Sequence, residues 1–139
     1  MNLNNARSEE TLAIESTSAI SPQDMARYRA TAHRRATRRQ RMLEARRRAA
    51  WEIARRAAAL LKADYGVSRV VLFGSLSHDE PFTPRSDIDL AVWGLDEHVY
   101  YRVVSRLLDL DPSISIDLLR VETLSDDLIR AIETTGMQL

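Results

Sequence analysis

Three aspartates lie in or beside apolar segments of this 139-residue chain, where a charged side chain needs a chemical reason. Asp87 and Asp89 are one residue apart, and strand side chains alternate between faces, so a strand would project both to the same side. Asp117 lies between Ile116 and Leu118. These carboxylates predict a site for Mg²⁺, a hard cation that prefers oxygen ligands and substrate phosphates.

A Gly-Ser pair follows the apolar run at residues 70–73. Gly74 has no side chain, so the backbone can approach a phosphate closely, and Ser75 offers a hydroxyl and an N–H at the start of a helical turn. Together with the aspartates, this pair predicts binding of a nucleoside triphosphate. Two Mg²⁺ ions about 3.5–4 Å apart would assist an in-line phosphoryl displacement. Arg85, beside the aspartate pair, is interpreted either as a phosphate contact or as a solvated loop cation.

The elements that must position these residues follow from periodicity and turn residues. Ser21 as N-cap and Pro22 at the first helical position predict a helix start, and no Gly or Pro follows until Gly66, which suits a helix end. The core elements are expected as a helix at 46–63, a strand at 68–73, a strand at 87–93, a helix at 97–109, a strand at 113–121 and a helix that starts at Thr123 or Ser125 and runs to 133. This order predicts an α/β sandwich on a small sheet.

The third strand supplies a further carboxylate in Asp117. If this strand pairs beside the second, Asp117 can face the pocket of the aspartate pair, ligate the catalytic metal and help to deprotonate an attacking hydroxyl.

Composition narrows the function classes. The chain has no cysteine, so disulfides, thiolate chemistry and Cys-type zinc sites are excluded. No apolar run approaches the length of a membrane span, and we expect a cytoplasmic protein without a membrane partner. The formal net charge of zero hides an asymmetry: residues 1–62 hold 14 Lys and Arg against 6 Asp and Glu, and residues 63–139 hold 6 against 14. Such asymmetry suggests an anionic partner for one half and metal binding by the other.

We divide the chain into a flexible lead at 1–20, a basic helical arm at 21–45 and a domain at 46–139. The arm has no wide apolar face, because arginines recur on every side of the expected helix. Three interpretations stay open: an ordinary solvated helix, a surface for an acidic protein partner or a homo- or hetero-oligomer, and a nucleic-acid-binding element that contacts phosphates.

Three segments together resemble the minimal nucleotidyltransferases of the DNA polymerase beta superfamily, over about residues 46–139. They are Leu72-Phe73-Gly74-Ser75, Ser86-Asp87-Ile88-Asp89-Leu90 and Ile116-Asp117-Leu118. The resemblance implies the polymerase beta-like α/β fold, a small mixed sheet flanked by helices. It also implies Mg²⁺-dependent transfer of AMP from ATP to a hydroxyl, with pyrophosphate leaving. Gly74 and Ser75 match the family's triphosphate-binding turn, Asp87 and Asp89 its metal ligands, and Asp117 its third carboxylate.

Many stand-alone members of this size are antitoxins of a HEPN ribonuclease toxin, in some cases adding AMP to a toxin tyrosine. The resemblance therefore implies a HEPN-type toxin as partner. Two alternatives are neutralisation by binding with little catalysis, and transfer to a small molecule or RNA. The chain departs from the family pattern at Leu76, where many members have arginine, and in the spacer at 76–86, which is one residue longer than usual.

Overall fold

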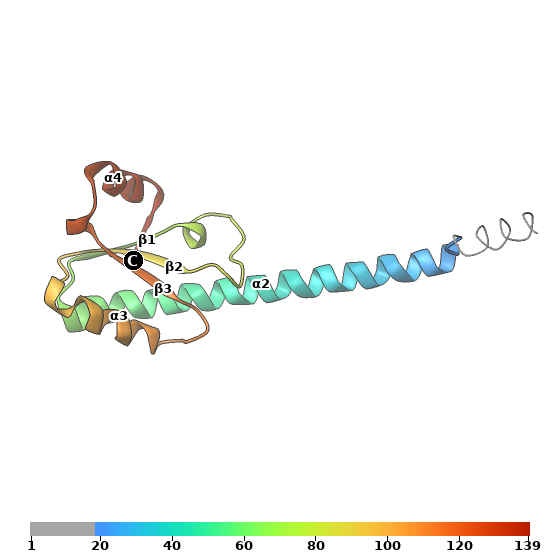
Figure 1. The fold of residues 1–139 in the computed structure, drawn as a ribbon, viewed down its shortest axis with the longest axis horizontal. Helices are drawn as coiled ribbons and strands as arrows, with labels where there is room; N and C mark the ends of the chain where they lie inside the picture. Colours follow the sequence, from blue (N-terminus) through green and yellow to red (C-terminus); the bar gives the residue numbers. More distant parts are fainter. Residues whose placement is uncertain (1–18) are drawn as a thin grey trace, which may run out of the picture. The chain divides into compact units, whose positions relative to one another are not determined.

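The structure is a computed structural model that describes residues 19–139 (Figure 1). The lead predicted at 1–20 lies almost wholly outside the described residues. The chain divides into two compact units, residues 1–39 and residues 40–139. No helix within residues 19–139 combines the length and the apolar character needed to cross a membrane.

Helix α2, Pro22–Tyr65, is the longest element. Its first turn begins as predicted, because the Ser21 Oγ accepts a hydrogen bond of 3.1 Å from the Asp24 N–H. Alanine and arginine, both strong helix formers, dominate the segment, and it forms one continuous helix. Gly66 follows it with a φ of +65°. The buried side chains of α2 begin only at residue 50: Ala50, Ile53, Ala54, Ala57, Ala58 and Leu61.

The sheet has four strands in the order β3-β2-β1-β4. They are β1 (Arg69–Phe73), β2 (Ile88–Trp93), β3 (Ile116–Arg120) and β4 (Met137–Gln138). Strand β1 pairs antiparallel with β2 and β4, whereas β2 and β3 are parallel. The sheet is therefore mixed, and the predicted α/β fold is confirmed. Strand β4 was not predicted, because two exposed residues at the chain end carry no strand periodicity.

Helices cover both faces of this sheet (Figure 1). On one face, buried residues of α2 and of α3 (Tyr100–Leu108) join the inward side chains of the strands in the main core. On the other face, Ile132 of α4 (Asp126–Thr135) packs with Val71 and Ala91 in a smaller core. Continuous apolar runs in β1 and β2 follow from this burial on two faces.

Local hydrogen bonds explain where the predicted bounds were wrong. The carboxylate of Asp111 accepts from the Ser113 N–H and Oγ at 2.8 and 2.6 Å, and this turn delays β3 from the expected residue 113 to Ile116. The Asp96 carboxylate accepts from the His98 N–H at 2.9 Å, so a 3₁₀ turn precedes α3.

Of the two expected starts of the last helix, Ser125 is confirmed and Thr123 is wrong. Ser125 caps α4 through a 3.3 Å bond from the Leu128 N–H, and the residues before it form a 3₁₀ turn at Val121–Thr123. Asp87 lies just before β2 instead of within it.

Candidate active site

Gly74 crosses directly over the carboxylate of Asp89. Phe73, the last residue of β1, pairs in register with Asp89 of β2, so the next residue must turn beside that side chain. Gly74 does so with φ +76° and ψ −156°, a conformation that is essentially restricted to glycine. A Cβ at position 74 would overlap Asp89 Oδ2 and lie 3.2 Å from Asp89 Cγ. The turn therefore requires glycine for both its backbone and its contact.

The second and third aspartates are neighbours across two parallel strands. Asp89 of β2 and Asp117 of β3 are register partners. The alternating residues Ile88 and Ile116 are buried on the opposite face, so the two carboxylates share the other face. Asp87 is exposed and precedes β2 by one residue. The structure thus brings Gly74 and the predicted aspartates to one end of the sheet.

The charges of these groups interact. Partial burial, followed by the negative charges of Asp117 and then Asp87, raises the pKa of Asp89 from its ordinary 3.8 to about 6. A cation bound to this carboxylate would offset the repulsion from the two like charges. The electrostatics of the site therefore fit a divalent metal.

The geometry adds a condition to that fit. Within residues 19–139, no three His, Cys, Asp or Glu side chains are close enough to enclose a metal by themselves. The expectation of a metal held by all three aspartates is therefore not met by the protein ligands alone. Mg²⁺ usually keeps only one or two protein carboxylates and completes its coordination with water and substrate phosphates. The residues present fit such a shared, nucleotide-dependent site.

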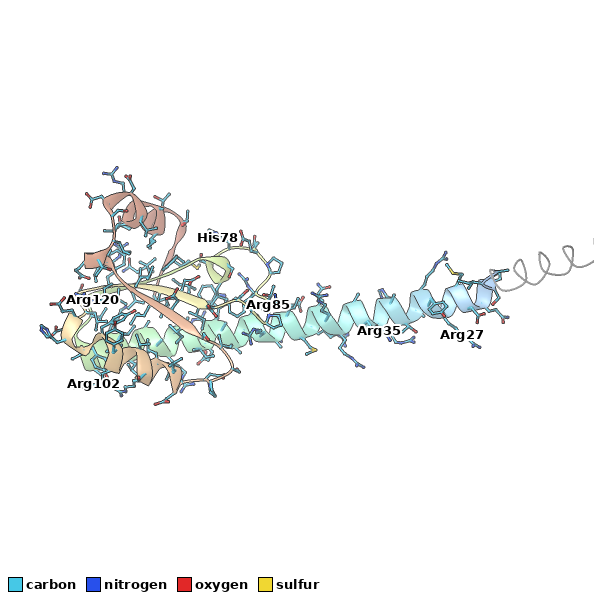
Figure 2. The ribbon with its side chains drawn as sticks, viewed as in Figure 1. Arg27, Arg35, His78, Arg85, Arg102 and Arg120 are labelled. Carbon is cyan, nitrogen blue, oxygen red and sulfur yellow. The ribbon has the colours of Figure 1, made fainter. Side chains whose placement is uncertain are left out.

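Ser75 and Arg85 flank the aspartates without firm contacts of their own. Ser75 opens the 3₁₀ turn Ser75–Ser77, and its carbonyl accepts from the His78 N–H at 3.4 Å. Arg85 is exposed (Figure 2), and within residues 19–139 its guanidinium makes no hydrogen bond or ion pair. Both interpretations of Arg85, phosphate contact and solvated cation, remain predictions.

Two arginines of α2, Arg46 and Arg47, contact this region and were not predicted from the sequence. Arg47 donates to three carbonyls of the loop that follows Ser75: Leu76 (2.9 Å), Glu80 (2.9 Å) and His78. Leu76 itself is fully buried, so the position where many relatives have arginine is a core position here.

Arg46 makes a second set of contacts. It donates to the carbonyls of Thr83 (3.1 Å), Pro84 (3.2 Å) and Ser113 (3.2 Å). The partners of both arginines are 29 to 67 residues away in sequence, and no local pattern distinguishes Arg46 and Arg47 from the arginines beside them. Only the tertiary structure identifies them.

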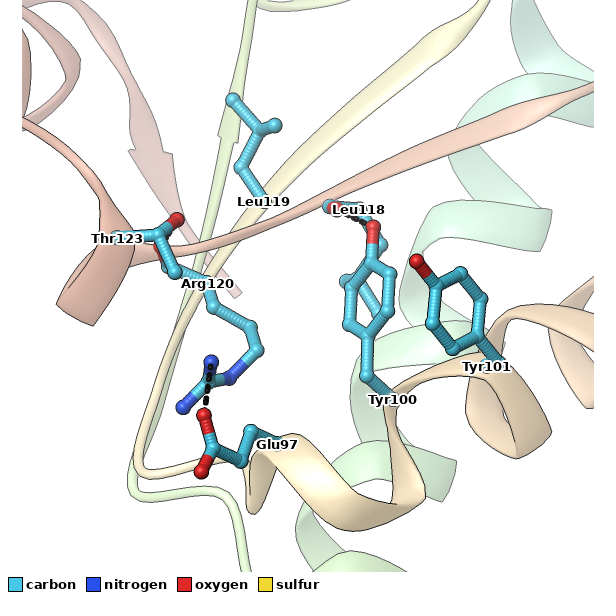
Figure 3. Close-up of a pocket in the computed structure, with 7 residues that line it drawn as sticks. All are labelled: Glu97, Tyr100, Tyr101, Leu118, Leu119, Arg120 and Thr123. Carbon is cyan, nitrogen blue, oxygen red and sulfur yellow. Dashed lines mark hydrogen bonds and ion pairs between the residues drawn. The ribbon is translucent and has the colours of Figure 1, made fainter.

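A pocket of about 350 Å³ lies beside edge strand β3 (Figure 3). It is lined by Glu97, Tyr100, Tyr101, Leu118, Leu119, Arg120 and Thr123. The Tyr100 hydroxyl donates to the Leu118 carbonyl at 2.7 Å, and burial together with the charge of Asp117 raises the Tyr100 pKa. Asp117 does not line the pocket, but it directly precedes the lining residue Leu118 on β3.

Comparison with known proteins finds two similar crystal structures of toxin–antitoxins. One of them is a toxin–antitoxin with AMP-PNP. Its sequence is 26% identical to this one, the TM-score is 0.52, and the match covers 61% of this chain and 70% of that chain. The other is a tyrosine-to-alanine mutant of the toxin–antitoxin MntA-HpeT. Its sequence is 27% identical to this one, the TM-score is 0.51, and the match covers 61% of this chain and 69% of that chain.

A weaker likeness, too slight to bear on function, is to a tri-AMPylated Shewanella oneidensis HEPN toxin in complex with MNT antitoxin. It is 24% identical, with a TM-score of 0.48, over 63% of this chain and 69% of that one. No curated protein matches the chain. Residues 56–139 match the family model described as Polymerase beta, Nucleotidyltransferase. The chain therefore belongs to the polymerase beta nucleotidyltransferase family, and its fold is the polymerase beta-like fold.

Proposed function

We propose that this chain is an antitoxin that transfers AMP from ATP to a hydroxyl, a tyrosine in particular, of a HEPN-type toxin. The observation that carries the proposal is the packing of Gly74 against Asp89, with Asp117 as its register partner. Family membership supports nucleotidyl transfer. The two toxin–antitoxin structures support a toxin as the partner, and the one with AMP-PNP supports an adenine nucleotide.

The chemistry is an in-line displacement at the α-phosphorus of ATP. The hydroxyl oxygen of the acceptor forms a bond to that phosphorus, and the bond to the bridging oxygen of the β-phosphate breaks, so pyrophosphate leaves. Gly74 and Ser75 offer backbone N–H groups and a hydroxyl to the phosphates. Asp117, exposed on the edge strand, accepts the proton of the attacking hydroxyl.

The aspartates would hold Mg²⁺ together with the nucleotide. Asp87 and Asp89 are its proposed protein ligands, with Asp117 contributing to a second ion, and phosphate oxygens complete the coordination. When bound, the metal neutralises charge that develops on the phosphates. The raised pKa of Asp89 supports this assignment, because a cation relieves the repulsion among the three carboxylates.

The acceptor is proposed to enter along the pocket beside β3. Its lining combines aromatic and apolar side chains with Arg120, whose Nε donates to the Leu95 carbonyl at 3.0 Å and is thereby held in place. Tyr101 is 83% exposed at the rim and provides a contact surface for a partner. Asp117, the proposed proton acceptor, directly precedes the lining residue Leu118 on β3.

Incubation of the chain with Mg²⁺, ATP labelled in the α-phosphate and the protein encoded by the adjacent gene tests the proposal. We expect label on that protein, at a tyrosine located by mass spectrometry. An Asp87→Asn, Asp89→Asn double variant should transfer no label. If this variant still neutralises the toxin in cells as well as the wild type, neutralisation by binding replaces catalysis. If label appears on RNA or a small molecule instead, the proposed acceptor is wrong.

We infer a separate role in polyanion binding for the basic arm. Six arginines between residues 22 and 39 are exposed, and within the described chain none of them forms an ion pair: Arg27, Arg29, Arg34, Arg35, Arg38 and Arg39. Guanidinium groups pair well with phosphates. Figure 2 labels two of them, Arg27 and Arg35.

RNA affinity measured over a range of salt concentrations tests this role. We expect weakening by roughly 0.7 log units per log[salt] for each phosphate neutralised on a single strand. A variant with Arg27, Arg34, Arg35 and Arg38 replaced by glutamine should show a smaller slope, because it neutralises fewer phosphates. Salt-independent binding, or no binding at all, would contradict the inference and leave an acidic protein or solvent as the partner of the arm.

A further inference from the structure

We propose that Arg46 and Arg47 are positioning residues that hold the nucleotide-binding turn and the aspartates in their working geometry. The inference rests on the proposed nucleotidyl transfer at that site. Both side chains come from adjacent positions of α2, yet they contact different parts of the site. Together they reach six backbone carbonyls, all within residues 76–113.

Arg47 holds the segment that follows the phosphate turn. Its Nη2 donates to the carbonyls of Leu76 and His78, and its Nη1 donates to the carbonyl of Glu80 at 2.9 Å. Leu76 comes directly after Ser75, so this contact fixes the exit of the turn that faces Asp89. The loop at 78–81 has no helix or strand to satisfy its carbonyls, and the guanidinium donates to two of them, those of His78 and Glu80.

Arg46 connects the two segments that lead to the aspartates. Its Nε and Nη2 donate to the carbonyls of Thr83 and Pro84, which precede Asp87 by a few residues. Its Nη1 donates to the carbonyl of Ser113, which precedes Asp117 on the next strand. One side chain thus fixes the entry to β2 and the entry to β3 relative to each other.

Arginine is required for this arrangement because its donors form a rigid, planar fork. Lysine carries the same charge but would reach fewer of these carbonyls at once. The Arg46 guanidinium also lies 5.5 Å from the centre of the Phe82 ring, and Phe82 is buried at 1% exposure, so the loop is packed as well as hydrogen-bonded. Among the ion pairs of residues 19–139, none involves Arg46 or Arg47, so carboxylates do not compete for these donors.

The test compares Arg46→Lys and Arg47→Lys with Arg48→Lys in the full chain. Arg48 is the matched control, because it is the next residue of α2 and is exposed. The first readout is amide hydrogen exchange of residues 75–87 and 113–117 without nucleotide. We expect exchange at 75–80 to accelerate about tenfold or more in Arg47→Lys, and exchange at 83–87 and 113–117 to do so in Arg46→Lys. Arg48→Lys should match the wild type.

The second readout is the kinetics of transfer. Arg47→Lys should raise the KM for ATP, since it loosens the phosphate turn. Arg46→Lys should lower kcat by roughly 10- to 100-fold with a smaller change in KM, since it misplaces the aspartates. Unchanged exchange in both variants would overturn the positioning role even if transfer fails altogether. Absence of transfer in the wild type would overturn the proposed function and leave the exchange result to decide this inference. Thermal unfolding of each variant confirms that it folds.

Discussion

Gly74 and Asp89 occupy space that no larger pair could share: a Cβ at position 74 would overlap Asp89 Oδ2 and lie 3.2 Å from Asp89 Cγ. Because Asp89 is also the register partner of Asp117, this contact connects the turn after β1 to carboxylates of β2 and β3. The phosphate-binding turn and the metal-binding aspartates of the proposed mechanism are therefore parts of one packed unit.

Replacement of Gly74 by alanine should destabilise the fold and abolish transfer. Its φ of +76° alone costs a side chain about 1–3 kcal/mol, and the overlap with Asp89 adds to that. Gly66→Ala is the matched control, because Gly66 has a φ of +65° but no atom within 4 Å of the added methyl group. Chemical denaturation measures the free energy of unfolding of both variants. A loss for Gly74→Ala no larger than for Gly66→Ala would show that the contact with Asp89 does not matter.

The free energy of unfolding should depend on pH through Asp89. Its folded pKa of about 6 lies above the ordinary 3.8, so the folded state binds the proton more tightly and loses stability as pH rises from about 4 to 6. Asp89→Asn should therefore stabilise the nucleotide-free protein at pH 7.5, by about 1–2 kcal/mol once partial exposure is allowed for, and much less at pH 4.

Denaturation at the two pH values, with the exposed loop variant Asp79→Asn as control, measures this difference. A stability change in Asp89→Asn that is the same at both pH values would contradict the electrostatic account. Addition of Mg²⁺ and AMP-PNP should stabilise the wild type and leave Asp89→Asn almost unchanged, because the cation takes the place of the proton at that carboxylate.

Introduction of the arginine that many relatives carry after the Gly-Ser pair should not improve nucleotide binding. Leu76 is 0% exposed, so Leu76→Arg would bury a charge and cost about 3 kcal/mol or more. His78→Arg, at an exposed position of the same loop, is the control and should be tolerated. A stable Leu76→Arg protein with a lower KM for ATP would show that position 76 faces the nucleotide after all.

Tyr101→Ala should weaken binding of the acceptor protein without changing binding of the nucleotide. Tyr101 is exposed at the rim of the pocket beside β3, so its removal should raise the KM for the partner protein several-fold without changing the KM for ATP. Steady-state transfer with each substrate varied in turn separates the two. Tyr28→Ala, at an exposed position of the basic arm, serves as control. If Tyr101→Ala and Tyr28→Ala change the KM for the partner protein equally, the acceptor does not bind along this pocket.

Much of the fold could be predicted because its signals are local. Ser21 before Pro22 predicted the start of α2, and the apolar run before Gly74 predicted β1. Asp89 lies within β2 as predicted, whereas Asp87 precedes the strand by one residue. The role of Asp117 depended on a pairing of the second and third strands that the sequence left open, and the parallel register of β2 and β3 makes Asp117 the partner of Asp89.

The contacts of Arg46 and Arg47 could not be predicted from the sequence. Whether an arginine in a basic helix faces solvent or a distant carbonyl depends on where the loop at 76–84 and Ser113 are brought in three dimensions. The 3₁₀ turn at 97–99 follows a hydrogen bond from the His98 N–H to the Asp96 side chain, which periodicity does not detect.

Transfer from ATP labelled separately in the α- and γ-phosphates tests the central claim most directly. With Mg²⁺ and the HEPN-type partner, the wild type should place the α-label on the partner and release the γ-label as pyrophosphate. Asp117→Asn should lower the rate by at least about 100-fold while its affinity for the partner, measured by titration, stays the same. Transfer of the γ-label, or full activity in Asp117→Asn, would contradict the account.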